Sequence, residues 1–281
     1  MAELEAPIDQ QPEPVEKDRS RVLSDLVVGV LLLAVLGLAA YLRFTGLNWD
    51  SNTHLHPDER FLTMVETSIQ PPQSIGEYFN TDTSPLNPHN VGHGFFVYGS
   101  FPIFLVRYLA EWTGMSGYDE VHLLGRAVSG ISDLVSILLI YLIGERLFNR
   151  RVGILAALFT TLSVLLIQHA HFFVVDPLAN VFILAGLYFS VRVIGQGKLS
   201  DYLLFGVMLG LAVASKISAA PLAVAVALAG LTNVLSAPED QKSAVISRTL
   251  TFLLAAAFLS LLVFRVFQPY AFEGPGFFDV K

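Results

Sequence analysis

Residues 26–42 read LVVGVLLLAVLGLAAYL, a run of 17 residues without one charged side chain. The hydrocarbon core of a bilayer is about 30 Å thick, and a helix that crosses it needs roughly 17–25 mostly apolar residues. Arg19 and Arg21 lie before the run and Arg43 follows it. No short charged leader and small-residue cleavage site frame it, as they would in a secretory signal peptide. The run therefore predicts a first transmembrane helix.

The composition of the whole chain points to the same class of protein. Of its 281 residues, 53% are hydrophobic and 15% are charged, and the mean hydropathy is +0.59. A soluble domain is nearer about 25% charged, so a water-soluble globule is excluded, and so is a disordered chain. The absence of cysteine excludes disulfides, thiolate metal sites and cysteine nucleophiles. The net charge of −7 provides no basic surface for nucleic acid.

Further apolar runs predict that the chain crosses the membrane about seven times. These runs lie at about 126–146, 152–170, 177–194, 201–215, 217–235 and 249–267. We place a break at Lys216, because a lysine in hydrocarbon is costly. Residues 93–112 are aromatic but contain Pro102, Arg107 and Glu111, which favours a juxtamembrane or re-entrant helix over a complete span. The predicted fold is an all-α polytopic membrane bundle.

Basic residues determine the predicted orientation of this bundle. Loops rich in lysine and arginine stay in the cytoplasm, which assigns to that side the N-terminus and the loops that contain Arg146, Arg150, Arg151, Lys198, Lys242 and Arg248. We expect a disordered cytoplasmic tail at 1–23, a membrane domain at 24–267 and an outer tail at 268–281. Within the membrane domain, 45–125 would form a long first extracytoplasmic loop. The protein is expected in the plasma membrane.

A first group of ionisable residues lies just beyond the first span, in HLHPDER at 54–60. Adjacent carboxylates such as Asp58 and Glu59 repel each other, so such a pair usually has a cationic partner or holds a proton. A pair of this kind suits a general base. Together with His56, the two acids could instead bind a divalent metal, although their spacing is not diagnostic. A further alternative is a solvated loop in which Pro57 begins a helix.

More ionisable residues are placed on the same side of the membrane or directly beneath it: Arg126, Asp133, Asp176 and Lys216. Several have a structural alternative. Asp133 can form a buried ion pair, Asp176 can begin a helix, and Lys216 can extend to the lipid headgroups. Taken together with the first group, these residues predict a site for a phosphate-bearing ligand. Arg126 and Lys216 would hold the phosphate, and a carboxylate would accept a proton.

Four short motifs occur in order along the chain: PDER (57–60), GRAVSG (125–130), VVDPL (174–178) and GLAVASK (210–216). In these motifs and their spacing, over about residues 22–235, the sequence resembles the GT-C-fold glycosyltransferases of family 39. That family includes protein O-mannosyltransferases and bacterial aminoarabinose transferases of lipid A. The resemblance implies a GT-C-like helix bundle with a polyprenyl-phosphate sugar donor and a lipid, glycan or protein acceptor. Homo- and hetero-oligomers both stay open.

The resemblance also implies a role for each matching residue. Asp58 would be the general base of an inverting transfer at the extracytoplasmic face, with Glu59 as its companion. Lys216 and Arg126 would contact the donor phosphate, and the cavity would be lined by Asp176, His56, Arg60 and His93. No cofactor is implied with certainty, and a divalent metal stays open. The aminoarabinose transferases carry Glu-Lys-Pro where this chain has Val-Gly-His-Gly at 91–94, so a different sugar or acceptor is expected.

Two other functions stay open as alternatives. A transporter would use Asp133 and Asp176 as ion or proton sites, but it predicts repeated halves, and the sequence shows no internal repeat. A non-catalytic subunit would retain the fold within a larger complex. Family members usually continue into more helices, whereas this chain stops after QPYAFEGPGFFD (268–279). We therefore expect a fragment, a truncated gene or a minimal core of seven helices.

Overall fold

The computed structural model describes residues 16–273, and the regular elements in this range are all helices. This result confirms the predicted all-α membrane bundle. The bundle consists of α1 (Glu16–Phe44), α5 (Tyr118–Leu147), α6 (Arg150–Thr161), α7 (Val164–Ala170), α8 (Asp176–Gln196), α9 (Leu199–Ser215), α10 (Ala223–Leu235) and α11 (Lys242–Phe267). The remaining helices are short: α2 (Pro57–Ser68), α3 (Ile75–Tyr78), η1 (Pro88–Val91), α4 (Ser100–Thr113), η2 (Ile217–Leu222) and η3 (Pro269–Ala271).

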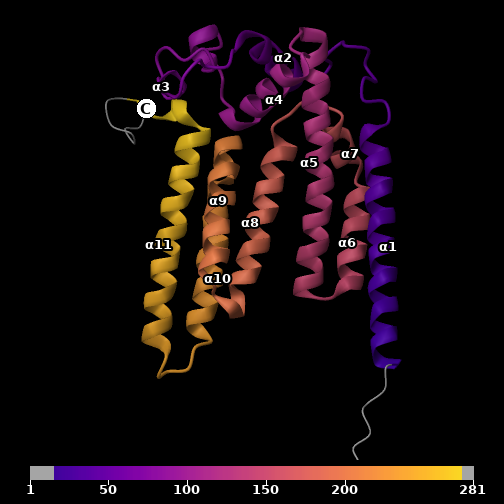
Figure 1. Cartoon of the computed structure of the whole chain (residues 1–281), viewed down its shortest axis with the longest axis vertical. Coiled ribbons are helices and arrows are strands. Elements are labelled where there is room, and N and C mark those ends of the chain that lie inside the picture. Colours follow the sequence, from indigo (N-terminus) through magenta and orange to yellow (C-terminus); the bar gives the residue numbers. More distant parts are fainter. Residues whose placement is uncertain (1–15, 274–281) are drawn as a thin grey trace, which may run out of the picture.

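The bundle helices lie side by side, and successive passes alternate in direction (Figure 1). Five of the described helices are long and apolar enough to cross a membrane, and a sixth span results if α6 and α7 count as one. The apolar helix α9 is shorter, with 17 residues, or about 25 Å at 1.5 Å per residue. The chain is therefore an integral multi-pass membrane protein. The count of about seven spans stays a prediction.

The first helix is longer than the apolar run that predicts it. It begins at Glu16, inside the segment 1–23 that was expected to be disordered. Glutamate, lysine and arginine, which are frequent in this stretch, are good helix formers, and each residue added to an existing helix gains a hydrogen bond. The rest of the expected tail, 1–15, and the last part of the chain, 274–281, lie outside the described residues.

Residues 45–117 form a layer across one end of the bundle, here called the loop layer (Figure 1). Its helix α4 has 14 residues and a length of about 21 Å, which is too short to cross a bilayer. The layer has an apolar core of fully buried side chains, which include Leu62, Val65, Ile69, Leu86, Ile103 and Val106. It is therefore a folded unit and not the solvated loop of the alternative interpretation.

The loop layer is attached to the ends of two bundle helices. Gly99 donates its backbone N–H to the carbonyl oxygen of Ser215 at 3.2 Å. A Cβ at Gly99 would lie 2.0 Å from the carbonyl oxygen of Ala214, so only glycine allows this close approach. The hydroxyl of Tyr78 donates to the carbonyl oxygen of Val266 on α11 at 2.5 Å. Residues of the layer are thereby held against the ends of α9 and α11.

Arg43, near the end of α1, connects three helices. Its Nε donates to Oδ2 of Asp133 on α5 at 2.6 Å, and its Nη1 donates to the carbonyl oxygen of Thr161 at 2.6 Å. Thr161 is the last residue of α6, where backbone carbonyls lack partners within the helix. At this point α6 meets α7 at an angle of 61°. Arg43 therefore neutralises Asp133 in a buried ion pair and also satisfies a buried carbonyl oxygen at the end of α6.

Replacing Arg43 by leucine is expected to destabilise the protein by about 3–5 kcal/mol, because Asp133 would keep a buried charge without its partner. The midpoint of thermal inactivation in detergent, followed by size-exclusion chromatography, measures this change. The double variant Arg43→Leu, Asp133→Leu removes both charges and should recover most of the loss. A single variant as stable as the wild type would show that the pair does not hold the bundle together.

Candidate active site

The sequence HPD at 56–58 determines where α2 begins. His56 precedes the helix, and its Nδ1 accepts a hydrogen bond from the backbone N–H of Asp58 at 3.2 Å. Pro57 takes the first helical position, where its missing N–H has no cost. The first turn of a helix also favours an acidic side chain. Asp58 is thus held in the first turn of α2, where it is half-buried.

Tyr98 of the loop layer is close to Asp58. Burial, the charge of Asp58 with a hydrogen bond to it, and the charge of Asp176 raise the pKa of Tyr98 to about 12. The phenol therefore stays protonated near neutral pH and can donate to a carboxylate. The chain has nine tyrosines, and nothing in the sequence distinguishes Tyr98 from the others. Through Tyr98, the structure brings Asp58 and Asp176 into the same neighbourhood.

Lys216 and Asp176 form an ion pair between two helix ends. Nζ of Lys216 lies 2.5 Å from Oδ1 of Asp176. Asp176 begins α8, and Lys216 follows the last residue of α9. The two side chains are 41% and 40% exposed, and an ion pair so accessible to solvent contributes at most about 1 kcal/mol to stability. Both side chains are therefore accessible from outside the bundle and contribute little to its stability.

Both residues of this ion pair line a cavity of about 340 Å³, here called the lysine cavity. Its polar lining residues are Asp133, His169, Asp176, Asn180, Lys216 and Ser218, and its apolar ones include Leu165, Leu166 and Ile183. Small-molecule sites usually combine an apolar wall with a few placed polar groups. A cavity of this kind suits a ligand with an anionic group next to an apolar chain.

Glu59, the residue after Asp58, belongs to a buried network around Arg126. The guanidinium nitrogens of Arg126 lie 2.8 and 2.6 Å from the two carboxylate oxygens of Glu59 and 2.9 Å from Oδ2 of Asp50. All three side chains are 0% exposed. Burial alone would raise the pKa of Asp50, but the hydrogen bond and the charge of Arg126 outweigh it, so the pKa is lowered. Asp50 is therefore ionised in this network.

The partners of Arg126 leave its guanidinium no access to the lysine cavity. Besides the two carboxylates, it donates from Nη1 to the carbonyl oxygen of Leu47 at 2.8 Å. Arg126 is also not among the described residues that line the lysine cavity. The structure thus brings Asp58, Asp176 and Lys216 toward one place, whereas it gives Arg126 and Glu59 each other as partners.

Glu59 also connects α2 to the segment before α8. Its Oε2 accepts the backbone N–H of Phe173 at 2.7 Å, three residues before Asp176. The ring of Phe173 lies against Gly125 of the GRAVSG motif, where a Cβ would come within 2.1 Å of a ring carbon. This close contact explains the first glycine of the motif. The network therefore fixes the position of Asp58, which precedes Glu59, relative to Asp176.

The other residues expected in the cavity have partners elsewhere. His56 packs on Phe172 with 4.7 Å between the ring centres. Arg60 donates to a backbone carbonyl oxygen just before α2 at 3.2 Å. Nε2 of His93 lies 2.9 Å from Oγ of Ser68. Among the residues from 16 to 273, these three are not part of the lining of the lysine cavity.

Asp58, Glu59 and His56 do not assemble into a metal site. Both carboxylate oxygens of Glu59 are bound by Arg126, and Nδ1 of His56 accepts the N–H of Asp58. In the part of the chain that the structure describes, no three histidine, aspartate or glutamate side chains are placed to hold a metal ion. The geometry of these residues therefore gives the divalent-metal alternative no support.

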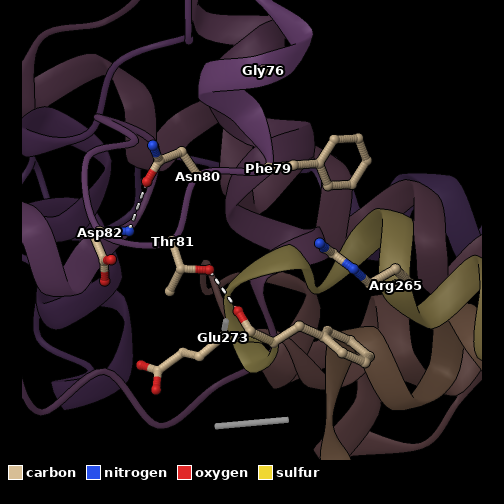
Figure 2. Close-up of a pocket in the computed structure, with 8 residues that line it drawn as sticks. Gly76, Phe79, Asn80, Thr81, Asp82, Arg265 and Glu273 are labelled. Atoms are coloured by element: carbon tan, nitrogen blue, oxygen red, sulfur yellow. Dashed lines mark hydrogen bonds between the residues drawn. The ribbon is translucent and has the colours of Figure 1, made fainter. Parts of the chain in front are cut away.

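A second cavity, of about 470 Å³, lies where the loop layer meets the end of α11 (Figure 2). The guanidinium carbon of Arg265 lies 4.8 Å from the ring centre of Phe79 and 4.9 Å from that of Phe272. The hydroxyl of Thr81 donates to the carbonyl oxygen of Phe272 at 2.6 Å. These contacts join the layer to the chain after α11.

We regard the lysine cavity as the candidate active site, because Asp176 and Lys216 line it and Asp176 lies near Tyr98, which interacts with Asp58. Asp58 itself is not among the described residues that line the cavity.

A sequence relationship covers the region from the start of α5 to the end of α11. The family model described as dolichyl-phosphate-mannose-protein mannosyltransferase matches residues 114–268, more than half of the chain. The chain belongs to this family. The match to the mannosyltransferase family includes Arg126, Asp176 and Lys216, whereas Asp58 and most of the loop layer precede it. No curated protein sequence matches the chain significantly.

Two solved structures share the fold of this mannosyltransferase-family chain. One is the S. cerevisiae protein O-mannosyltransferase Pmt1-Pmt2 complex bound to the sugar donor, with a TM-score of 0.65 and 18% identity over 89% of this chain and 35% of the matched chain. The other is the apo form of the Archaeoglobus fulgidus oligosaccharyltransferase, with a TM-score of 0.60 and 16% identity over 90% and 31%. The chain thus spans about a third of the length of each match. These findings confirm the predicted GT-C-fold glycosyltransferase family.

Proposed function

We propose that the chain transfers a sugar from a polyprenyl-phosphate donor to an acceptor hydroxyl in the lysine cavity. The observation that carries this proposal is that Tyr98 interacts with both Asp58 and Asp176, and that Asp176 is paired with Lys216, although these residues come from separate parts of the chain. The family description names dolichyl phosphate mannose, so mannose is the first sugar to test. The acceptor would be a lipid, a glycan or a protein.

The proposed chemistry is a single displacement with inversion at the anomeric carbon. Asp58 accepts the proton of the acceptor hydroxyl as its oxygen forms a bond to that carbon. The bond between the carbon and the phosphate oxygen breaks, and its electron pair leaves with the lipid phosphate. Lys216 stabilises the charge that grows on this phosphate, which is typically a large contribution to catalysis. The protonated Tyr98 would orient the carboxylate of Asp58.

Arg126 and Glu59 have a positioning role in this proposal. Their network is fully buried, and it holds the segment that ends at Asp176 against the start of α2. A displacement of about 1 Å in such a support can cost a large part of the rate. Arg126 therefore acts on the reaction through Asp58 and Asp176, and not by contact with the phosphate.

The lipid tail would lie in an apolar groove of about 270 Å³ between α9, η2 and α11. The groove is lined by Leu209, Val213, Ala220, Ala257, Ser260, Leu261 and Phe264. Ala220 belongs to η2, which starts directly after Lys216. A phosphate at Lys216 could therefore have its isoprenoid chain on the apolar surface that follows along the same segment.

We propose that the reaction occurs on the extracytoplasmic side of the plasma membrane. The loop layer lies at one end of the bundle, and the hairpin between α5 and α6, with Arg146, Arg150 and Arg151, lies at the other (Figure 1). Under the positive-inside rule, the end with the basic hairpin faces the cytoplasm. The yeast structure is a complex of two mannosyltransferases, so a hetero-complex is a further proposal for this chain.

The donor class can be tested on the full chain purified from membranes. We expect mass spectrometry of co-purified lipids to show a polyprenyl phosphate or its glycoside. The purified chain in liposomes should also consume added polyprenyl-phosphate mannose. Ion flux without donor consumption would instead support the transporter alternative. A stable co-purified partner, with neither activity in the isolated chain, would support the non-catalytic subunit.

Lys216→Ala is expected to raise the KM for polyprenyl-phosphate mannose by about 10–100-fold, because a hydrogen bond to a charged group is worth about 1.5–3 kcal/mol. Initial rates of donor consumption over a range of donor concentrations measure this change. Lys242→Ala is the matched control, since Lys242 pairs with Glu239 in the loop before α11, and it should leave the KM unchanged. An unchanged KM in Lys216→Ala would contradict the phosphate-binding role.

A further inference from the structure

The charges in and beside the lysine cavity are balanced without a ligand. Asp133 is paired with Arg43 at 2.6 Å, and Asp176 is paired with Lys216 at 2.5 Å. A sugar linked to a lipid through a phosphate diester would add one negative charge. When the sugar leaves, the lipid phosphate becomes a monoester with a charge of up to about −2. This additional charge requires a cation that the two ion pairs do not supply.

His169 is the other titratable side chain in the lining of the cavity, among the residues that the structure describes. It lies in the last turn of α7 and is half-buried. Histidine is the side chain whose charge ordinarily changes between pH 5 and 8. His169 is also close enough to Asp133 for their charges to interact. It can therefore supply the missing positive charge by taking up a proton.

The ring of His169 has no structural partner that would compete with a ligand. Within residues 16–273 it makes no side-chain hydrogen bond. His171, two residues later, differs in this respect, because its ring nitrogens lie 2.8 and 3.0 Å from the backbone oxygens of Ile167 and Thr45. The bend between α6 and α7 thus presents one of the two histidines to the cavity and leaves the other to hold the backbone.

We infer that His169 contacts the donor phosphate together with Lys216 and does so in its protonated form. The inference rests on the proposed function, which supplies the donor. His169 takes up a proton from solvent when the donor binds and releases it when the lipid phosphate leaves. The proton of the acceptor hydroxyl goes separately to Asp58. The imidazolium thereby offsets the charge that grows on the phosphate as the bond to the sugar breaks.

Charged and titratable groups surround His169 on several sides. They come from four neighbouring segments and from the end of its own helix: Asp133 of α5 with Arg43 of α1, Asp176 of α8, Lys216 after α9, and His171. Each acid already has a cationic partner. The bound phosphate is therefore the group expected to favour protonation of His169, and donor affinity should fall as pH rises.

The test is the affinity of the full chain in nanodiscs for polyprenyl-phosphate mannose at pH 6, 7 and 8. The phosphate diester of this probe does not titrate in that range. We expect wild-type affinity to fall on the order of 10-fold between pH 6 and pH 8. His169→Gln should bind on the order of 10-fold more weakly at pH 6 and show no such decrease. His169→Lys should bind tightly at all three values. His89→Gln, at an exposed histidine of the loop layer, is the matched control and should behave as the wild type.

Two results would overturn the inference and leave the proposed function intact. One is a His169→Gln variant with wild-type affinity and the wild-type pH dependence. The other is a His169→Lys variant that binds no better than His169→Gln, since this would assign the ring to the structure of the cavity. A wild-type chain that neither binds nor consumes the donor would overturn the proposed function as well.

Discussion

Asp58→Asn is expected to lower the kcat for sugar transfer by about 10²–10⁴-fold, because a carboxamide cannot accept the proton of the acceptor hydroxyl. The substitution retains the size of the side chain. The start of α2 should also persist, since His56 accepts the backbone N–H of residue 58 and not its side chain. Donor binding should stay close to wild type, because Lys216 is unchanged. Donor consumption at saturating donor, together with donor affinity, separates the two effects.

Asp82→Asn provides the matched control for this variant. Asp82 is an exposed aspartate of the loop layer and lines the second cavity (Figure 2). Lys216 is not among the described residues that line this cavity. Its substitution should leave both kcat and donor affinity unchanged. General-base catalysis predicts a loss of about 100-fold or more in kcat. A kcat of Asp58→Asn within about threefold of the wild-type value would therefore show that Asp58 is not the base.

Arg126→Met is expected to destabilise the protein by at least about 3–5 kcal/mol, because it leaves the carboxylates of Asp50 and Glu59 buried without a cation. We expect a large decrease in the thermal inactivation midpoint and in the yield of protein from membranes. Arg126→Lys should also be destabilised, since an ammonium group cannot reproduce the fork that binds both oxygens of Glu59. Both variants should lose transfer activity.

A combined variant separates charge burial from function. Arg126→Met with Asp50→Asn and Glu59→Gln removes the unpaired charges and should recover a large part of the stability. Its kcat should stay low, because the support of Asp58 and Asp176 is altered. The sequence-based expectation that Arg126 contacts the donor phosphate predicts something else, namely an Arg126→Lys variant of normal stability with a raised donor KM. That result would contradict the positioning role.

The sequence predicts those features that depend on the length and polarity of single segments. Residues 26–42 predict a membrane span because the run is long enough to cross a bilayer and contains no charged side chain. The break at Lys216 follows from the cost of a lysine in hydrocarbon. Once the number of passes between Asp58, Asp176 and Lys216 is known, their position at one end of the bundle follows by counting, and the structure agrees.

The remaining features depend on contacts between segments that are far apart in the chain. Arg126 has the same residue type whether it binds a phosphate or two carboxylates, and only the folded chain shows Asp50 and Glu59 around it. The bend after Thr161 contains neither proline nor glycine, so the sequence does not predict it. The carbonyl oxygen of Thr161 is instead satisfied by Arg43 of another helix. Tyr98 gains its role from Asp58, which lies 40 residues earlier in the chain, and the sequence alone does not show that the two side chains are close.

Asp58 and Glu59, neighbours in the first turn of α2, point in different directions and therefore have different surroundings. Successive side chains on a helix point about 100° apart, so one carboxylate looks toward Tyr98 while the next enters the arginine network. A one-residue shift of the helical register that placed Asp58 in the arginine network would move Pro57, and not Glu59, to the place where Asp58 now lies. The proton acceptor would then be neutralised by a guanidinium, and no carboxylate would face Tyr98. Helical phase, as much as residue identity, makes Asp58 a candidate base.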